Sequence, residues 1–205
     1  MIRLGRVEAT GGFLLLVAWL NYIDPSCLVP MAMLACAVHE LGHYAAILAC
    51  GKSVKGMRLT VIGAEMVLEH PLGYWQEGLT ALAGPGVNLL LALIFCCFEE
   101  GLLFAGLNLA LALFNLAPVG RLDGGRAVYC TLALLSGPDL AGRVGGWLDG
   151  LCALGMAAAG LLLAGLRGNF TLLLAAVWLS AGIFRQNIYG RKRNRACQRG
   201  RKKVQ

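Results

Sequence analysis

The strongest constraint on this chain is an apolar run at residues 28–50 that carries two histidines and a glutamate near its middle. The sequence at that point is His39-Glu40-Leu41-Gly42-His43. Helical residues four positions apart lie one turn apart on the same face, so His39 and His43 can ligate one metal ion. Zn²⁺ takes imidazole ligands at this spacing, and a glutamate beside them can accept the proton of a water at the metal. We therefore predict a zinc centre with His39 and His43 as ligands and Glu40 as the catalytic base.

The composition is that of a membrane protein. The chain is 58% hydrophobic and 14% charged, with a mean hydropathy of +0.69, whereas about a quarter of the residues of a soluble domain are charged. Because ionisable groups at membrane depth are costly, this setting favours a functional role for the histidines over two ordinary buried histidines beside a chance glutamate. Apolar segments recur at residues 9–23, 28–50, 79–98, 102–117, 147–166 and 170–184.

These segments predict an all-α polytopic membrane protein of about six transmembrane helices. We expect one membrane domain over residues 1–190 and a basic tail over residues 191–205. With six spans and a cytoplasmic N-terminus, all of the 18 Lys and Arg residues except Arg167 fall on the cytoplasmic side. This distribution follows the positive-inside rule, so we expect a multi-pass protein of the cell membrane with both termini in the cytoplasm.

The net charge of +7 comes mainly from the basic tail. A run of this kind after a last span is typical of a topology anchor at anionic lipid. Nucleic-acid binding is the alternative interpretation of such a run. We favour the lipid bilayer as the partner of the tail and expect no nucleic-acid partner.

The third zinc ligand is predicted to be Asp123, since a catalytic zinc site usually has three protein ligands and a water. Asp123 follows the fourth apolar segment, which Pro118 should end or kink, and two glycines come directly after it. The second and fourth spans run in the same direction, so His39 and Asp123 both approach the cytoplasmic side. His70 lies in a polar stretch and is expected at the surface. An ordinary loop with a capping aspartate is the alternative.

The segment after the zinc-binding helix, residues 59–68, is rich in β-forming residues and contains a Gly63-Ala64 break. We expect a short membrane-associated hairpin there, with a simple connector as the alternative. Gly63 is a candidate substrate contact in this hairpin.

Two asparagines, Asn88 and Asn115, are polar groups at membrane depth. Each is a candidate for substrate or oxyanion contacts. Hydrogen bonds between packed helices are an equally good explanation of both.

Three sequence elements stand in the order in which site-2 proteases, the zinc intramembrane metalloproteases, carry them. They are the motif at His39–His43, an A-G-P-x-x-N pattern at Ala83–Asn88 and an N-x-x-P…L-D-G pattern at Asn115–Gly124. The chain resembles this family over roughly residues 10–190. Its compact layout is most similar to the bacterial sporulation branch, which processes the sigma-K precursor. The sequence shows neither that branch's CBS domain nor the PDZ-like insert of the envelope-stress branch.

The resemblance implies a zinc-dependent intramembrane endopeptidase that cleaves a membrane-embedded or membrane-tethered protein near the cytoplasmic face. A sigma-factor precursor is one such substrate. The resemblance also implies a strand beside the active site that can pair with an extended substrate, and a membrane inhibitor or regulator as a partner. The rival interpretation is a membrane protein that binds zinc for transport or structure. A transport path would need ligands spread through the membrane, whereas the polar residues here cluster at one depth.

Overall fold

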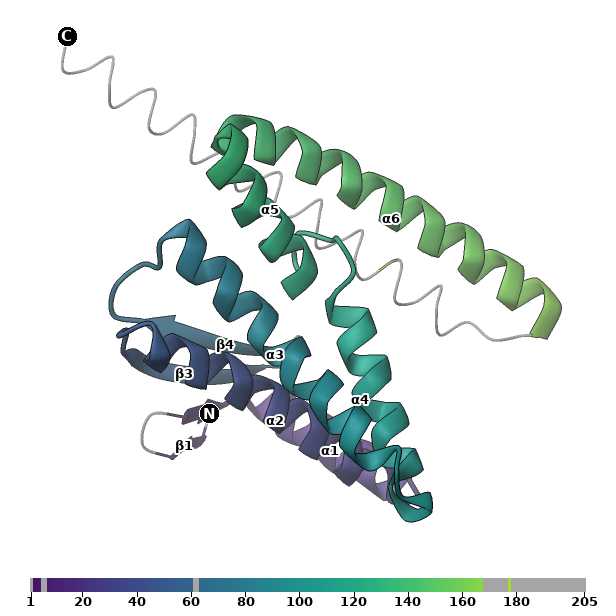
Figure 1. The fold of residues 1–205 in the computed structure, drawn as a ribbon. Helices are drawn as coiled ribbons and strands as arrows, with labels where there is room; N and C mark the ends of the chain where they lie inside the picture. The colour runs from purple at the N-terminus through teal and green to yellow at the C-terminus, as the bar shows by residue number, and fades with distance from the viewer. Residues whose placement is uncertain (1, 5–6, 61–62, 168–176, 178–205) are drawn as a thin grey trace, which may run out of the picture.

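Figure 1 shows the computed structural model, which describes residues 2–4, 7–60, 63–167 and 177. The helices are α1 (Gly11–Tyr22), α2 (Leu28–Ala49), α3 (Tyr74–Phe95), α4 (Leu102–Asn115), α5 (Asp123–Ser136) and α6 (Pro138–Arg167), with a 3-10 turn η1 (Glu99–Gly101) before α4. The strands are β1 (Ile2–Leu4), β2 (Val7–Ala9), β3 (Val54–Thr60) and β4 (Gly63–Leu68). Apart from Val177, the expected apolar segment 170–184 and the basic tail lie outside the described residues.

Helix α3 is the centre of the helical part, because it packs against α2, α4 and α5. Its contact with α2 is close: a Cβ added at Gly42 would lie 2.9 Å from the carbonyl oxygen of Ala83. Small residues at such contacts let helix backbones approach each other in membranes. As a consequence, side chains that project from α2 reach the backbone of α3 directly.

Three helices in the described part of the chain are long and apolar enough to cross a membrane. They are α2, α3 and residues Pro138–Leu162 of α6. Helices α1 and α4 have only 12 and 14 residues, which correspond to about 18 and 21 Å at 1.5 Å per residue. The number of six transmembrane helices is therefore not confirmed and stays a prediction.

The strands form one four-stranded sheet in the order β1-β2-β3-β4. The expected hairpin is present as β3 and β4, which pair antiparallel, and Gly63 begins β4 opposite Thr60. The sequence interpretation was incomplete in treating the protein as all-α with a hairpin alone, because β2 pairs with β3 in parallel and β1 extends the sheet further. The backbone N–H of Thr10 donates to the Leu59 carbonyl at 3.0 Å, which ties the start of α1 to this sheet.

The connection between α4 and α5 is a compact loop held against α6. Helix α4 ends at Asn115, before Pro118, as the sequence predicted. The N–H of Gly120 donates to Asp149 of α6 at 2.6 Å. Gly124 lies in the first turn of α5, where an added Cβ would come within 2.1 Å of the Leu116 carbonyl oxygen. The glycine after Asp123 thus allows α5 to pack closely on the loop.

Candidate metal centre

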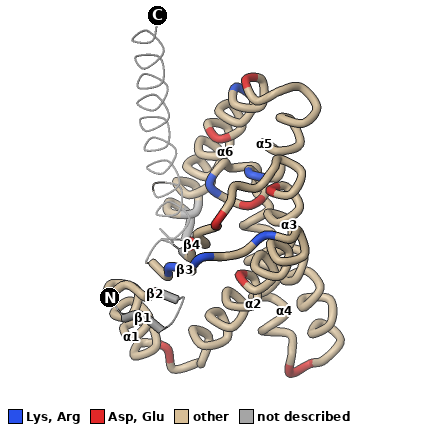
Figure 2. Tube along the Cα trace, turned by 90° about the vertical axis from the view of Figure 1, so that its left-hand side faces the viewer, with Lys and Arg blue, Asp and Glu red and all other residues tan. Residues whose placement is uncertain are grey.

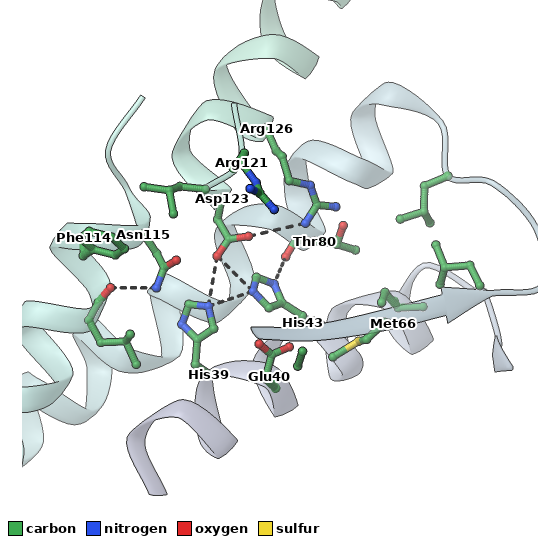
Figure 3. Close-up of a pocket in the computed structure, with 16 residues that line it drawn as sticks. His39, Glu40, His43, Met66, Thr80, Phe114, Asn115, Arg121, Asp123 and Arg126 are labelled. Carbon is green, nitrogen blue, oxygen red and sulfur yellow. Dashed lines mark hydrogen bonds and ion pairs between the residues drawn. The ribbon is translucent and has the colours of Figure 1, made fainter. Parts of the chain in front are cut away.

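The three predicted ligands, His39, His43 and Asp123, lie together in the structure, with Asp123 at the first residue of α5 (Figure 3). The Oδ2 atom of Asp123 lies 3.1 Å from Nε2 of His39 and 3.2 Å from Nε2 of His43. The two Nε2 atoms are 3.0 Å apart. All three side chains are largely buried. Both histidines come from α2, and Asp123 lies 84 positions after His39 in the sequence.

The geometry of this triangle fits a zinc ion. Tetrahedral zinc, with bonds of about 2.0–2.1 Å, separates its ligand atoms by about 3.3–3.4 Å. The far nitrogens of both rings are already engaged: Nδ1 of His43 donates to the Thr80 carbonyl at 2.7 Å, and Nδ1 of His39 donates to Oδ1 of Asn88 at 2.5 Å. With both protons on Nδ1, the lone pairs of both Nε2 atoms point at each other and at a carboxylate. A cation held between the two Nε2 atoms and the carboxylate makes this arrangement favourable. The group of His39, His43 and Asp123 is therefore consistent with Zn²⁺.

Helix α3 provides the wall on which the two imidazoles rest. A Cβ added at Gly84 would lie 2.4 Å from Nε2 of His43 and 2.8 Å from Nε2 of His39. Only glycine leaves this space open. The glycine of the Ala83–Asn88 pattern is thereby explained by the close approach of the His39 and His43 rings to the backbone of α3.

Asp123 is held by a cation on the side away from the histidines. One guanidinium nitrogen of Arg126 lies 3.5 Å from Oδ1 of Asp123, and another lies 3.6 Å from Oε1 of Glu77. Because Arg126 engages Oδ1, the other oxygen, Oδ2, stays directed at the histidines as an ionised ligand.

A cavity of about 380 Å³ opens beside the metal centre. Glu40 lines it together with His39 and His43, as Figure 3 shows. One side of the cavity is formed by alternate residues of β4. These residues are Ala64, Met66 and Leu68. Further lining comes from the end of α4, from the loop before α5 and from Arg126, and it includes Phe114, Asn115, Arg121 and Leu122.

The three substrate-binding candidates occupy different positions. Asn115 lines the cavity, and its Nδ2 donates to the Leu111 carbonyl at 3.0 Å. Asn88 is fully buried, does not line the cavity and accepts a hydrogen bond from His39, a predicted metal ligand. Gly63 begins β4, directly before Ala64, which lines the cavity.

Sequence reasoning missed two contributors to the site, Arg126 and the Thr80 carbonyl. Arg126 had a readable signal, since it stands three residues after Asp123 and so one helical turn away. The Thr80 carbonyl had none, because any residue offers a backbone carbonyl and only the packing of α3 selects this one.

Comparisons with known proteins show which proteins this chain is similar to. No family model matches the chain. A curated protein of Synechocystis, named "Putative zinc metalloprotease", is 36% identical in an alignment of 130 residues that covers 54% of this chain. The chain spans 34% of the length of that relative. A solved structure of a site-2 protease from Methanocaldococcus jannaschii superimposes with a TM-score of 0.65, covering 90% of this chain and 93% of the other at 22% identity. The chain therefore has the fold of a site-2 protease.

Proposed function

We propose that this protein is an intramembrane zinc endopeptidase. The observation that supports it best is the position of Glu40: it stands next to His39 on α2 and lines the same cavity as both histidines. A purely structural zinc site has no need of a carboxylate beside its ligands. The fold of a site-2 protease and the similarity to a zinc metalloprotease point the same way.

The residues of the site have two proposed roles, metal binding and proton transfer. His39, His43 and Asp123 would hold Zn²⁺, which when bound polarises a scissile carbonyl and makes water more acidic. Glu40 accepts the proton from the attacking water and passes it to the leaving amine. Asn115 presents its side chain at the same cavity, which suits a contact with the substrate backbone or with the developing oxyanion.

The substrate is a protein embedded in the membrane or tethered to it, bound in extended form along β4. This strand pairs with β3 alone among the described strands, so it forms one edge of the sheet. Its alternate residues, Ala64, Met66 and Leu68, line the cavity. A peptide bond inside a helix is shielded from attack, whereas a segment paired with an edge strand is unwound and presents its carbonyls.

We further propose that cleavage takes place near the cytoplasmic face and that both termini lie in the cytoplasm. The support for this orientation is the distribution of Lys and Arg in the sequence, interpreted by the positive-inside rule. A membrane-associated sigma-factor precursor is the substrate suggested by the resemblance to the sporulation branch. A membrane-bound regulator would act on the same site.

The test is cleavage by the Glu40→Gln variant, with zinc content measured in parallel. We expect about one zinc per chain and at least a 100-fold loss of cleavage of a co-expressed membrane-tethered precursor. Glu65→Gln serves as the matched control, because Glu65 is an exposed residue of β4 that does not line the cavity. Full cleavage by Glu40→Gln would contradict the assignment. A zinc-loaded wild type that cleaves no tethered precursor but moves zinc across vesicles would favour the transporter instead.

A further inference from the structure

Asn108 is a fully buried asparagine of α4 that does not line the cavity. Its Oδ1 accepts a hydrogen bond of 2.7 Å from Nδ2 of Asn88 on α3. Asn88 in turn accepts from Nδ1 of His39 on α2. A continuous chain of hydrogen bonds therefore joins α4 to a candidate metal ligand through α3.

The direction of this chain is fixed at its outer end by a backbone carbonyl. Nδ2 of Asn108 donates to the Phe104 carbonyl at 2.9 Å, so the oxygen of the Asn108 amide faces Asn88. Nδ2 of Asn88 then has both of its protons engaged, one by Asn108 and one by the Ala35 carbonyl at 3.2 Å. Only the Oδ1 atom of Asn88 is left to face His39.

We propose that Asn108 is a positioning residue of the metal centre. By holding the Asn88 amide in one orientation, it keeps the proton of His39 on Nδ1 and leaves Nε2 free for the metal ion. If the Asn88 amide rotated by half a turn, its NH₂ group would face Nδ1, and His39 would have to carry its proton on Nε2, where it cannot ligate. The inference rests on the proposed zinc site and names a residue of a third helix that controls it.

This role differs from that of a polar contact that merely joins two helices. Helix packing would be served by any hydrogen bond between Asn108 and Asn88, in either direction. The metal centre requires an acceptor at position 108. Some residues orient a metal ligand without touching the metal. Replacing such a residue typically lowers metal affinity by about 10- to 100-fold.

The test measures zinc affinity by chelator competition in the Glu40→Gln background. Asn108→Leu keeps the approximate size but removes the acceptor, and we expect zinc to bind about 10- to 100-fold more weakly. Asn108→Asp keeps an oxygen that can face Asn88, so we expect its zinc affinity to fall clearly less than that of Asn108→Leu. Phe104→Leu is the control for packing, because it removes the ring that meets Phe95 edge to face yet retains the Phe104 carbonyl.

The absorption spectrum of bound Co²⁺ gives a second readout, which a role in packing alone would not change. We expect an altered spectrum in Asn108→Leu and an unaltered one in Phe104→Leu. If Asn108→Leu does not fold, Asn108→Ala takes its place with the same expectation.

Two groups of results would overturn the inference, and they can be told apart. Unchanged affinity and spectrum in a folded variant that lacks the acceptor would overturn the role of Asn108 alone, as would an equal loss in Asn108→Asp. If the Glu40→Gln parent binds no zinc, or His39→Ala binds it as tightly as the parent does, the zinc site itself is wrong and the inference falls with it.

Discussion

Replacing Gly84 with alanine should abolish zinc binding while leaving the helices intact. The added Cβ would lie 2.4 Å from Nε2 of His43 and 2.8 Å from Nε2 of His39, and 3.4 Å is the lower limit of an ordinary contact. One ring would have to retreat by about 1.0 Å and the other by about 0.6 Å. Metal–ligand distances tolerate deviations of only about 0.2 Å.

The expected effect is a loss of zinc affinity of at least about 100-fold, which corresponds to about 2.8 kcal/mol at 1.4 kcal/mol per tenfold change. The rings cannot easily retreat, because Nδ1 of His43 is bonded to the Thr80 carbonyl and Nδ1 of His39 to Asn88. The same substitution favours the helix itself, since alanine is a better helix former than glycine by about 1 kcal/mol. Loss of metal should therefore not be accompanied by loss of helix.

Gly86→Ala is the matched control, because it makes the same change on the same helix where an added Cβ meets nothing within 4 Å. Both variants would be purified in detergent, their zinc content measured by mass spectrometry and their helix content by circular dichroism. We expect about one zinc per chain in Gly86→Ala and almost none in Gly84→Ala. If Gly84→Ala retained zinc with the affinity of the wild type, the two histidines could not lie against α3 as described, and the argument for the metal centre would be refuted.

Two further predictions concern the substrate and the topology. Proline at successive positions from Ala64 to Leu68 should reduce cleavage wherever the lost N–H points to the free edge of β4, because only alternate residues present their N–H to that side. The zinc content of these variants should stay unchanged. Normal cleavage by every variant that folds and binds zinc would rule out pairing of the substrate with β4. A reporter that is active only outside the cytoplasm should stay inactive when fused after Gln205, since the basic tail is retained inside, and an active reporter would reverse the proposed orientation.

The sequence alone predicted the parts of the site that depend on local periodicity. The four-residue spacing of His39 and His43 places both on one helix face in any protein. The position of Asp123 after Pro118 follows from the way proline ends a helix. The meeting of Asp123 with the histidines was inferred from the parallel direction of two segments, and the structure brings the three side chains together.

The remaining features depend on contacts that no local pattern encodes. Strands β1 and β2 were not expected, because residues 7–9 become a strand only by pairing with residues 57–59, about 50 positions away. The β-propensity of so short a segment is a weak guide, as strand formation depends on its neighbours. For Asn88, the sequence left substrate contact and helix packing open, and the structure shows hydrogen bonds with His39 and with α4.

The contacts between α2 and α3 fix the positions of the two histidines, although the third predicted ligand, Asp123, comes from α5. Thr80, Gly84 and Asn88 follow one another at four-residue intervals, so they form a single stripe along α3. His43, His39 and Ala35 face this stripe from α2, again four residues apart but in the reverse order. His43 contacts Thr80 and Gly84, and Asn88 contacts both His39 and Ala35. A helix rotates by about 100° per residue. A slip of one residue would therefore remove the carbonyl, the open space and the amide together, so the antiparallel register of this pair sets the position of both imidazoles at once.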